Sequence, residues 1–360
     1  MRNDLLLAIG TTKGAYLLRG ANGSTTVEGP LFRGDRVPSF AIDTRSGKPY
    51  LLAGRVSEIW GAGVSASDDV GRTWTDPETR ALRFPPETDA ALAQIWQLQP
   101  STPDEPDTVY AGVEPAALFR SDDRGETWSL VQSLWDHPHR TEWQPGFGGL
   151  GLHTILVDPR DAASLTVAIS AGGVYRSDDR GDTWTARNQG VPSAPLGDYP
   201  EFGQCVHKVA RDAEDLDRLF MQNHGGILRS DDRADTWVDI APGVPSDFGF
   251  PIVTHPRRGG TAYVIPLDGE DRCVVDAKCR LFRTQDTGSS WDALGTGLPE
   301  DDAHLTVLRD GFCHDGSDPL GLYFGTRTGQ VYGSADEGES WDLLVEHLPP
   351  VLCVRAATIS

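Results

Sequence analysis

Short apolar stretches recur along the chain, each bounded by Gly, Asp or Ser residues. The phrases "LTVAISAGGVYRSDD", "RLFMQNHGGILRSDD" and "LYFGTRTGQVYGSAD" each contain two such stretches around a tight loop. A run such as "HTILVDP" precedes the pair. Runs of four to eight apolar residues between turn-forming residues are typical of β-strands. The pattern therefore predicts a protein built from many short strands.

A second pattern is superimposed on the strands. A nine-residue phrase of the type "RSDDRGDTW" occurs six times, and its first Ser or Thr recurs every 50 to 56 residues, at Ser67, Ser121, Ser177, Ser230, Thr284 and Ser334. Four short strands in each repeat of about 54 residues correspond to one blade of a β-propeller. The repeat thus predicts an all-β propeller with four-stranded antiparallel blades.

The two ends of the chain complete the ring. The stretch "LLLAIGTTKGAYLLRGANG" near the N-terminus resembles a blade that has lost its box and its first strand, and "PPVLCVRAAT" near the C-terminus supplies one strand. We therefore expect seven blades in a single domain over residues 1–360. The first blade combines residues 1–30 with residues 349–358, and this closure removes free sheet edges.

The repeated phrase has the form Ser-x-Asp-x-Gly-x-Thr-Trp, known as the Asp box. The chain resembles the BNR/Asp-box propeller superfamily over essentially its whole length. The phrases "WQPGFGGLGLHTILVDP", "GQCVHK", "MQNHGG" and "DFGFPIVTHP" look like a group of bacterial WD40/YVTN/BNR-like proteins. These proteins are labelled sialidase-like or glycosyl-hydrolase-like, so the resemblance implies a propeller that acts on carbohydrate.

The six box aspartates are predicted to be structural. A short carboxylate can accept backbone N–H bonds within a tight turn, and one reaction does not need six equivalent acids. Ala234 replaces the box glycine in the fourth copy, where we expect strain because the position requires a positive φ. The aspartates are Asp69, Asp123, Asp179, Asp232, Asp286 and Asp336.

The charge balance restricts the partners. The chain has 53 acidic and 32 basic residues and a net charge of −21. Nucleic acids and anionic membranes both attract basic surfaces, so we expect neither as a partner. The apolar run at the N-terminus is too short for a signal peptide or a membrane span, and a cytoplasmic location is expected. Five cysteines do not suggest a disulfide scaffold, although Cys273 and Cys279 lie close enough in sequence to pair.

In a propeller, ligands bind where loops enter the first strand of each blade and join the second strand to the third. Four tryptophans outside the boxes fall in such loops: Trp60, Trp96, Trp135 and Trp143. Alignment of the first strands places one set of residues in the same register: Pro38, Trp96, His153, His207, Phe250 and Leu305. His224, Gln222 and Asn223 enter from a neighbouring loop. We expect these residues to surround the mouth of the central channel.

Three histidines in one place suggest acid–base chemistry, because imidazole titrates near neutral pH. His153, His207 and His224 are therefore the predicted catalytic residues, together with Glu201. A divalent metal is the alternative use of these imidazoles. No local spacing such as His-x-His with a carboxylate supports a metal, so no metal ligand is assigned and the cofactor is left unknown.

The sialidase label fits only in part. Sialidases use three arginines to bind the substrate carboxylate, and an Arg-Ile-Pro motif opens their first complete blade; Arg36-Val37-Pro38, before the box at Ser67, resembles this motif. No motif ties Arg55, Arg140 or Arg327 to the other two positions, and no late Tyr–Glu pair is evident. A true sialidase is therefore not expected. Retaining or inverting glycoside cleavage needs two carboxylates, and Glu201 or Asp198 with Glu58 or Glu114 are the candidate pairs.

Three functions follow from these patterns, and the third is a propeller whose ligand is a metal or cofactor, for which no phosphate-binding glycine loop is present. In the first, a His- and Trp-lined central pocket binds a small, polar, carbohydrate-like ligand and serves a glycoside-processing hydrolase or lyase. Its predicted ligand-binding residues are Arg36, Trp96, Trp143, Gln222, Asn223 and Phe250. In the second, the propeller is a non-catalytic scaffold for a protein partner, like Asp-box propellers of the photosystem-assembly and sortilin types.

Overall fold

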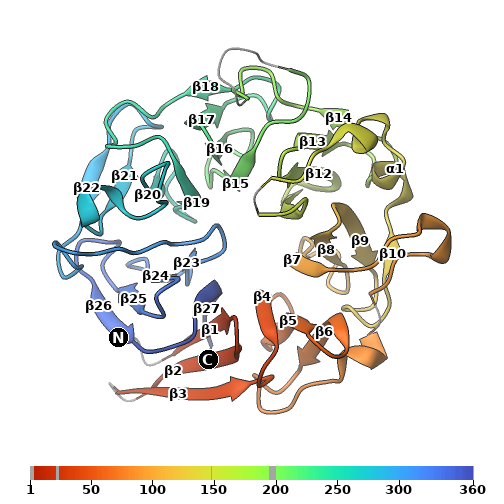
Figure 1. Ribbon diagram of the computed structural model, residues 1–360, viewed down its shortest axis with the longest axis horizontal. Coiled ribbons are helices and arrows are strands. Elements are labelled where there is room, and N and C mark those ends of the chain that lie inside the picture. The colour runs from red at the N-terminus through yellow and green to blue at the C-terminus, as the bar shows by residue number, and fades with distance from the viewer. Residues whose placement is uncertain (1–3, 22–23, 81, 147, 194–199, 360) are drawn as a thin grey trace.

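Seven antiparallel sheets lie side by side around a common centre in the computed structural model (Figure 1). The structure describes residues 4–21, 24–80, 82–146, 148–193 and 200–359. Each sheet is one blade, and its first strand lies nearest the centre. The predicted all-β, seven-bladed propeller is confirmed.

The blades are built from the following strands, each given from the centre outwards. Blade one contains β27 (Val351–Thr358), β1 (Leu5–Thr11), β2 (Gly14–Ala21) and β3 (Ser24–Leu31); blade two contains β4 (Arg36–Asp43), β5 (Tyr50–Ser57) and β6 (Gly61–Ser67). Blade three contains β7 (Gln94–Pro100), β8 (Val109–Glu114), β9 (Ala117–Ser121) and β10 (Ser129–Leu130); blade four contains β11 (Leu152–Asp158), β12 (Asp161–Ile169), β13 (Gly173–Ser177) and β14 (Thr185–Ala186).

The remaining three blades follow the same order. Blade five contains β15 (Val206–Arg211), β16 (Leu219–Asn223), β17 (Gly226–Ser230) and β18 (Val238–Asp239); blade six contains β19 (Gly249–Thr254), β20 (Ala262–Pro266), β21 (Leu281–Thr284) and β22 (Asp292–Leu294). Blade seven contains β23 (Phe312–His314), β24 (Leu322–Gly325), β25 (Val331–Ser334) and β26 (Asp342–Val345). The helical turns are α1 (Gln132–Trp135), η1 (Pro77–Arg80), η2 (Pro86–Thr88), η3 (Pro138–Glu142) and η4 (Val275–Ala277).

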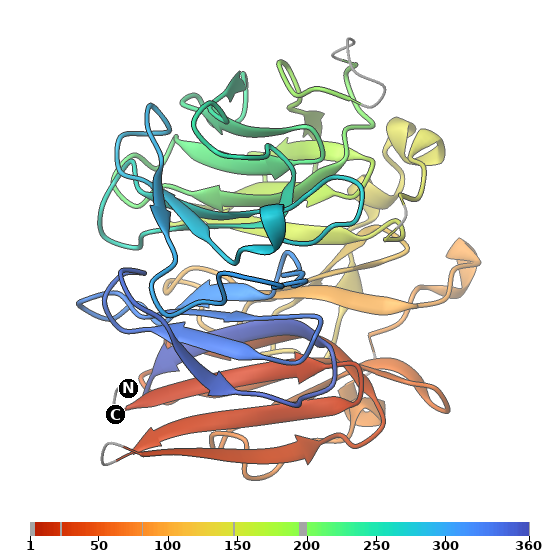
Figure 2. The same cartoon turned by 60° about the vertical axis from the view of Figure 1, so that its left-hand side comes forward.

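The ring closes as the sequence predicts. Strand β27 pairs antiparallel with β1, from Leu5 opposite Thr358 to Thr11 opposite Val351. Beyond the strands, the amide of Ile359 donates to the carbonyl of Asp4 at 2.7 Å. Figure 2 shows the two ends of the chain next to each other at this blade. Closure therefore links the first blade to the last segment of the chain.

Two expectations about strands are wrong. Among the described residues, blade two has three strands rather than four. The chain after its box contains Pro77, Pro85 and Pro86, which cannot donate ladder hydrogen bonds. This segment forms the short helical turns η1 and η2 in place of a fourth strand. The stretch around Leu305 is also not a first strand. Residues 303–308 have no regular structure, and β23 begins only at Phe312. The segment from Leu305 to Asp310 is instead a loop at the centre of the ring.

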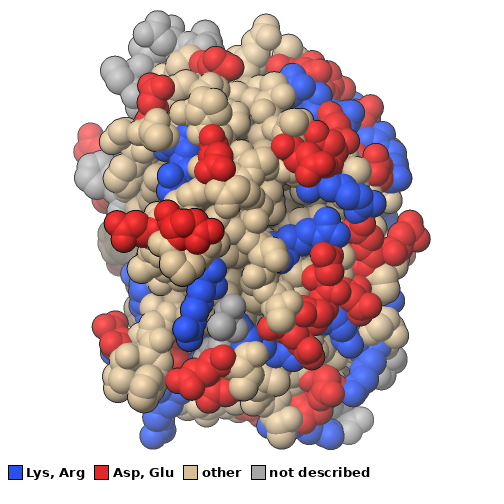
Figure 3. Space-filling model, turned by 90° about the vertical axis from the view of Figure 1, so that its right-hand side faces the viewer, with Lys and Arg blue, Asp and Glu red and all other residues tan. Residues whose placement is uncertain are grey.

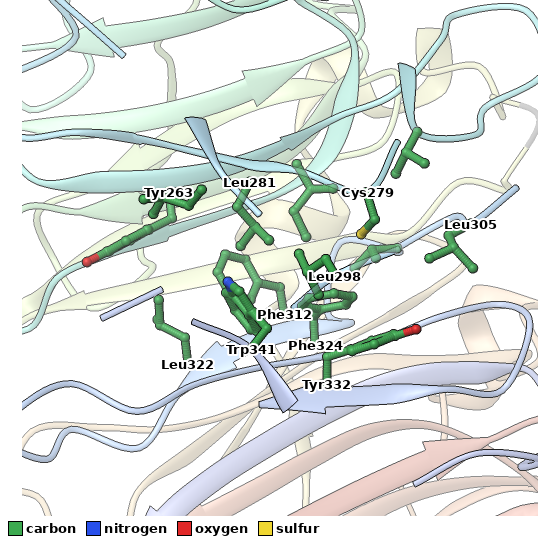
Figure 4. Close-up of a cluster of buried hydrophobic side chains, with 14 of the residues drawn as sticks. Tyr263, Cys279, Leu281, Leu298, Leu305, Phe312, Leu322, Phe324, Tyr332 and Trp341 are labelled. Atoms are coloured by element: carbon green, nitrogen blue, oxygen red, sulfur yellow. The ribbon is translucent and has the colours of Figure 1, made fainter. Parts of the chain in front are cut away.

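The core lies between neighbouring blades. Figure 4 shows one such cluster, in which Leu281 and Tyr263 of blade six face Phe312 and Phe324 of blade seven. Trp341, which follows the last box, is 4% exposed and lies 5.1 Å from the ring of Phe324. Box tryptophans thus fill the space between sheets, where aromatic rings bury much apolar surface.

The six Asp boxes have one geometry. In the third box, the hydroxyl of Ser177 accepts from the amide of Gly181 at 2.8 Å and donates to Asp179 at 2.7 Å. Asp179 also accepts from the amide and the hydroxyl of Thr183, at 2.9 and 2.6 Å. The same set of bonds occurs in the other five boxes. These bonds satisfy the polar groups of the turn, so the box carboxylates stabilise the fold.

Two further findings bear on the sequence predictions. Ala234 has a φ of +73°, a left-handed conformation that favours glycine, which agrees with the expected strain. All five cysteines are free, so Cys273 and Cys279 do not form a disulfide. Among the described residues, no helix is long and apolar enough to cross a bilayer.

The box geometry yields a stability prediction. Asp179→Ala removes the acceptor of three hydrogen bonds and should lower the free energy of unfolding by about 1 kcal/mol, as loss of a helix-capping residue does. Chemical denaturation would measure this change. Asp182→Ala, at an exposed position in the same turn, is the matched control and should change stability little. Equal stability of the two variants would contradict a structural role for the box.

Candidate functional site

A cavity of about 950 Å³ lies at the centre of the ring. Its lining residues come from all seven blades. They occur at the entrance to each first strand, as with Gln94 and Cys205, or in loops between second and third strands, as with Ala171 and His224. The boxes follow the third strand of each blade. The cavity therefore uses the two loop sets from which the sequence predicted a site.

A β-bulge recurs in the first strands at the cavity wall. Trp96, His153 and His207 are each the extra residue between two ladder pairs of β7, β11 and β15. Comparable register shifts occur in β4, β19 and at the β1–β27 pair. A bulge turns an additional side chain away from the regular alternation. The residues that the sequence alignment of the first strands placed in one register lie at these bulges, except for Leu305.

Arg309 is the central cation of the site. It comes from the loop that precedes β23 and lies over the rings of Trp96 and Phe250, with its guanidinium carbon 5.0 and 5.9 Å from their centroids. Its Nε–H donates to the backbone carbonyl of His207 at 3.0 Å. Trp96 in turn donates its indole N–H to Glu114 at 3.0 Å. One aromatic face that could have stacked on a sugar is thus used to hold Arg309.

Cys205, His207 and His224 form a compact group on the cavity wall. Their ligand atoms all lie within 4.8 Å of one another, and the Cys205 sulfur is 3.7 Å from Nε2 of His207. Burial and the nearby Arg309 lower the pKa of His207 to about 3. Burial and Arg272 lower the pKa of His224, and burial raises the pKa of the Cys205 thiol. All three groups are therefore neutral at pH 7.

The inner end of the cavity is bounded by a buried ion cluster. Asp310 is 3% exposed and accepts from Nζ of Lys208 at 2.9 Å and from the guanidinium of Arg355. Burial alone would raise the pKa of Asp310, but the two cations together hold it well below its usual range. Two cations around one carboxylate leave this end of the cavity positively charged.

His153 does not line the cavity, although it shares the bulge position of His207. It is fully buried, with Nε2 2.9 Å from the carbonyl of Val206 and Nδ1 3.1 Å from the hydroxyl of Thr154. A carbonyl only accepts, so Nε2 carries the proton and Nδ1 accepts from Thr154. Both ring nitrogens are therefore committed, and His153 connects β11 to β15.

Four other predicted site residues also lie outside the cavity lining. The Gln222 side chain donates to the carbonyl of Asp247 at 2.7 Å, and that of Asn223 to the carbonyl of Pro192 at 3.1 Å. Trp143 is 4% exposed, and its indole N–H donates to the Tyr175 hydroxyl at 2.9 Å.

Glu201 is the fourth. Its side chain is 72% exposed and lies 3.9 Å from His139. Its candidate partner Asp198 is outside the described residues. Of the candidate carboxylates that the structure describes, Glu58, Glu114 and Glu201, only Glu114 lines the cavity.

The structure brings seven predicted residues to the cavity and adds others. Those predicted are Arg36, Pro38, Trp96, Glu114, His207, His224 and Phe250; those missed as site residues include Cys205, Arg272, Arg309, Asp310 and Phe248. Cys205 stands two residues before His207 in "GQCVHK", a spacing that puts both side chains on one face of a strand and could have signalled it. No sequence signal marks Arg309, because its position depends on a loop that the pattern misassigned as a strand.

The burial of His153 yields a second stability prediction. His153→Ala would leave the Val206 carbonyl without its partner and create a cavity between two blades, at a cost of about 2–4 kcal/mol in the free energy of unfolding. His347→Ala is the control, because that side chain is 88% exposed. Denaturant titrations would compare the two. A His153→Ala protein as stable as the control would show that the bond to β15 is dispensable.

Buried imidazoles also predict a pH dependence. Burial and neighbouring arginines lower the pKa of His255 and His314 to about 4, and burial with Arg309 and Lys208 nearby lowers the pKa of His153 well below its usual value. In the unfolded chain a histidine titrates near 6.5, so unfolding takes up protons below that pH. The contribution of these neutral imidazoles to the free energy of unfolding is therefore complete above about pH 6.5 and is lost as the pH falls toward 4. Denaturant unfolding between pH 7.5 and 5 should show uptake that rises to about four protons at pH 5, one each at His153, His207, His255 and His314; a flat profile would contradict it.

Comparison with known proteins places the fold in context. No protein-family model matches the chain. A xyloglucanase from Paenibacillus sp is 26% identical over 324 residues, which cover 80% of this chain and 30% of that protein. The chain thus spans about a third of the length of that relative.

Two solved structures share the architecture. An ancestral GH74 enzyme superimposes with a TM-score of 0.57 at 14% identity, covering 86% of this chain and 38% of that one. YCF48 bound to D1 peptide gives a TM-score of 0.56 at 13% identity, covering 96% and 87%. The chain is therefore a seven-bladed β-propeller that is distantly related in sequence to xyloglucanases and has the fold seen in GH74 enzymes and in YCF48.

Proposed function

We propose that the central cavity binds a small anionic ligand of the carbohydrate type, such as a sugar acid. The observation that carries this proposal is that the guanidinium of Arg309 lines the cavity without an ion-pair partner among the described residues. Among the described residues, its Nε–H has a protein acceptor, the carbonyl of His207, and no carboxylate forms an ion pair with the guanidinium. Burial lowers the pKa of Arg309, yet a guanidinium stays charged at neutral pH. Asp310 and Glu114 attract this charge without contacting it, and a desolvated cation that lacks a direct ion pair favours an anion beside it.

Several other arginines that are buried or partly buried differ from Arg309 in this respect. Each of the following pairs with at least one carboxylate: Arg45 with Asp43, Arg176 with Asp178, Arg211 with Asp158, Arg283 with Glu339 and Arg355 with Asp310. Figure 3 shows acidic and basic side chains mixed on one side of the molecule. The protein thus pairs several of its less exposed arginines with carboxylates, whereas Arg309 lies in the central cavity and, among the described residues, has no such ion pair.

The rest of the lining supports an anionic ligand of modest size. A volume of about 950 Å³ lies within the range of pockets for small molecules. Arg36, Arg272 and Arg327 also line the cavity, and the carboxylate of Asp310 is already balanced by two cations. Planar guanidinium groups bind a carboxylate through two parallel hydrogen bonds. Glu114 and Glu142 supply acceptors for hydroxyl groups on the same ligand.

The carbohydrate class is supported by the distant relationship to a xyloglucanase. Trp96 and Phe250 add apolar surface of the kind that sugar rings contact. Binding of the ligand is proposed here, and catalysis is left aside, because Glu201 lies outside the lining and His153 has both nitrogens engaged.

Ligand binding can be measured by calorimetry with glucuronate, galacturonate, glucose and inorganic phosphate. We expect the uronates to bind, and Arg309→Gln to weaken them about 10- to 100-fold, because a hydrogen bond to a charged group contributes about 1.5–3 kcal/mol. Arg33→Gln is the control, since Arg33 is exposed and does not line the cavity.

The glucose and phosphate titrations distinguish a sugar acid from a neutral sugar and from a phosphate. Equal affinity for glucose and glucuronate would show that the anionic part of the proposal is wrong, and tight binding of phosphate alone would replace the sugar with a phosphate. If none of the four binds to the folded protein, the central-pocket function is wrong. The scaffold function, in which a protein partner covers this face, would then be the better account.

A further inference from the structure

We propose that Cys205, His207 and His224 form a binding site for one thiophilic divalent metal ion, of which Zn²⁺ is the best match. The site does not depend on the proposed sugar acid, because it is built from other side chains and can be tested without any organic ligand. All three residues line the central cavity, and their ligand atoms lie within 4.8 Å of one another.

The distances fit tetrahedral coordination. Zn²⁺ binds thiolate sulfur at about 2.3 Å and imidazole nitrogen at about 2.0–2.1 Å, which places the two donors about 3.6 Å apart. The Cys205 sulfur lies 3.7 Å from Nε2 of His207. The pair therefore already has the separation of two ligands of one ion, and the ligand atom of His224 lies within 4.8 Å of both.

The tautomer of His207 is set in advance. Its Nδ1 lies 2.5 Å from the carbonyl of Gly249 on the neighbouring first strand, and a carbonyl can only accept. Nδ1 therefore carries the proton, and the lone pair of Nε2 faces Cys205. A histidine that ligates a metal usually donates its other N–H to a carbonyl or carboxylate, which orients the ring. His207 has this arrangement.

His224 is tied to the same group through the backbone. Its amide donates to the carbonyl of Cys205 at 2.9 Å, so the loop after β16 and the start of β15 move as one unit. Its ring packs edge-to-face against His207 and Phe248, with centroids 5.5 and 5.1 Å apart. All three ligands are thus held by first-strand and loop backbone, as metal binding without large rearrangement requires.

The donor set selects the metal. One sulfur and two imidazole nitrogens favour Zn²⁺ or other borderline-soft ions over Mg²⁺ or Ca²⁺, which prefer oxygen. Three protein ligands would leave one position of a tetrahedral ion for a ligand from outside the protein. The nearby guanidinium of Arg309 repels a cation, but loss of the thiol proton on binding adds a negative charge beside the ion. A non-metal account also exists: the thiol can simply donate a weak hydrogen bond to His207.

The experiment uses the full chain after treatment with a chelator and dialysis. Titration with Co²⁺ should give a thiolate-to-metal absorption band in the near ultraviolet that saturates at one equivalent, and Zn²⁺ should displace it. Cys205→Ser should abolish the band and weaken Zn²⁺ at least about 100-fold. His224→Ala should weaken Zn²⁺ by at least about tenfold, since even loss of an outer-shell partner costs 10–100-fold.

Cys273→Ser is the matched control, because Cys273 is a partly exposed thiol that does not line the cavity. It should leave the band and the Zn²⁺ affinity unchanged. Melting temperatures without metal would confirm that each variant is folded. Absence of the band in the wild type, or a band that survives in Cys205→Ser, would overturn the site. Cys205 and His207 would then be a hydrogen-bonded pair, and the proposal for sugar acids would be unaffected.

Discussion

The seven first strands share one constraint, which is that each has an edge facing the centre of the ring with no further strand to pair with it. Several of their polar backbone groups are satisfied by a side chain from the preceding or following blade. Ser39 donates to the carbonyl of Ile95 and His153 bonds that of Val206, while the side chain of Gln97 accepts from the amide of Ile155. Without these bonds, buried carbonyls and amides at the centre would be unpaired, at a cost of about 1–3 kcal/mol each.

The same constraint explains why neighbouring histidines have different properties. His153 and His207 occupy equivalent bulges, and each bonds a carbonyl on the next blade. His153 uses Nε2 for this bond and Nδ1 for Thr154, so neither nitrogen remains. His207 uses Nδ1, which leaves Nε2 directed toward Cys205. Equal positions in a repeat therefore do not have equal chemistry, because the tautomer depends on local partners.

This difference also sets the limit of sequence-based prediction here. The Asp boxes were predictable because local residues alone determine them: a Ser, an Asp and a positive-φ residue at fixed spacing make the turn. The closing strand was predictable because the N-terminal repeat lacks one strand and the C-terminal segment supplies one. The register of the first strands was predictable for the same reason. Trp143, Gln222 and Asn223 were assigned to the pocket by their loops, but whether a side chain on a loop turns to the cavity or to its own backbone depends on neighbours distant in sequence. Arg309 illustrates the opposite error, since apolar residues around Leu305 imitate a strand that the chain does not form.

Arg309 owes its position to the ion cluster beside it. Asp310 is held by Lys208 from blade five and by Arg355 from the closing strand, and its carbonyl accepts from the amide of Val354 at 2.8 Å. These contacts fix the backbone of the loop on both sides of the ring. Trp96 then restrains the guanidinium from a third blade. A cation held in this way loses little further freedom on binding an anion, and such preorganisation favours affinity. The buried cluster of Asp310, Lys208 and Arg355 therefore contributes to the site by fixing the position of Arg309. Its own three charges are paired with one another.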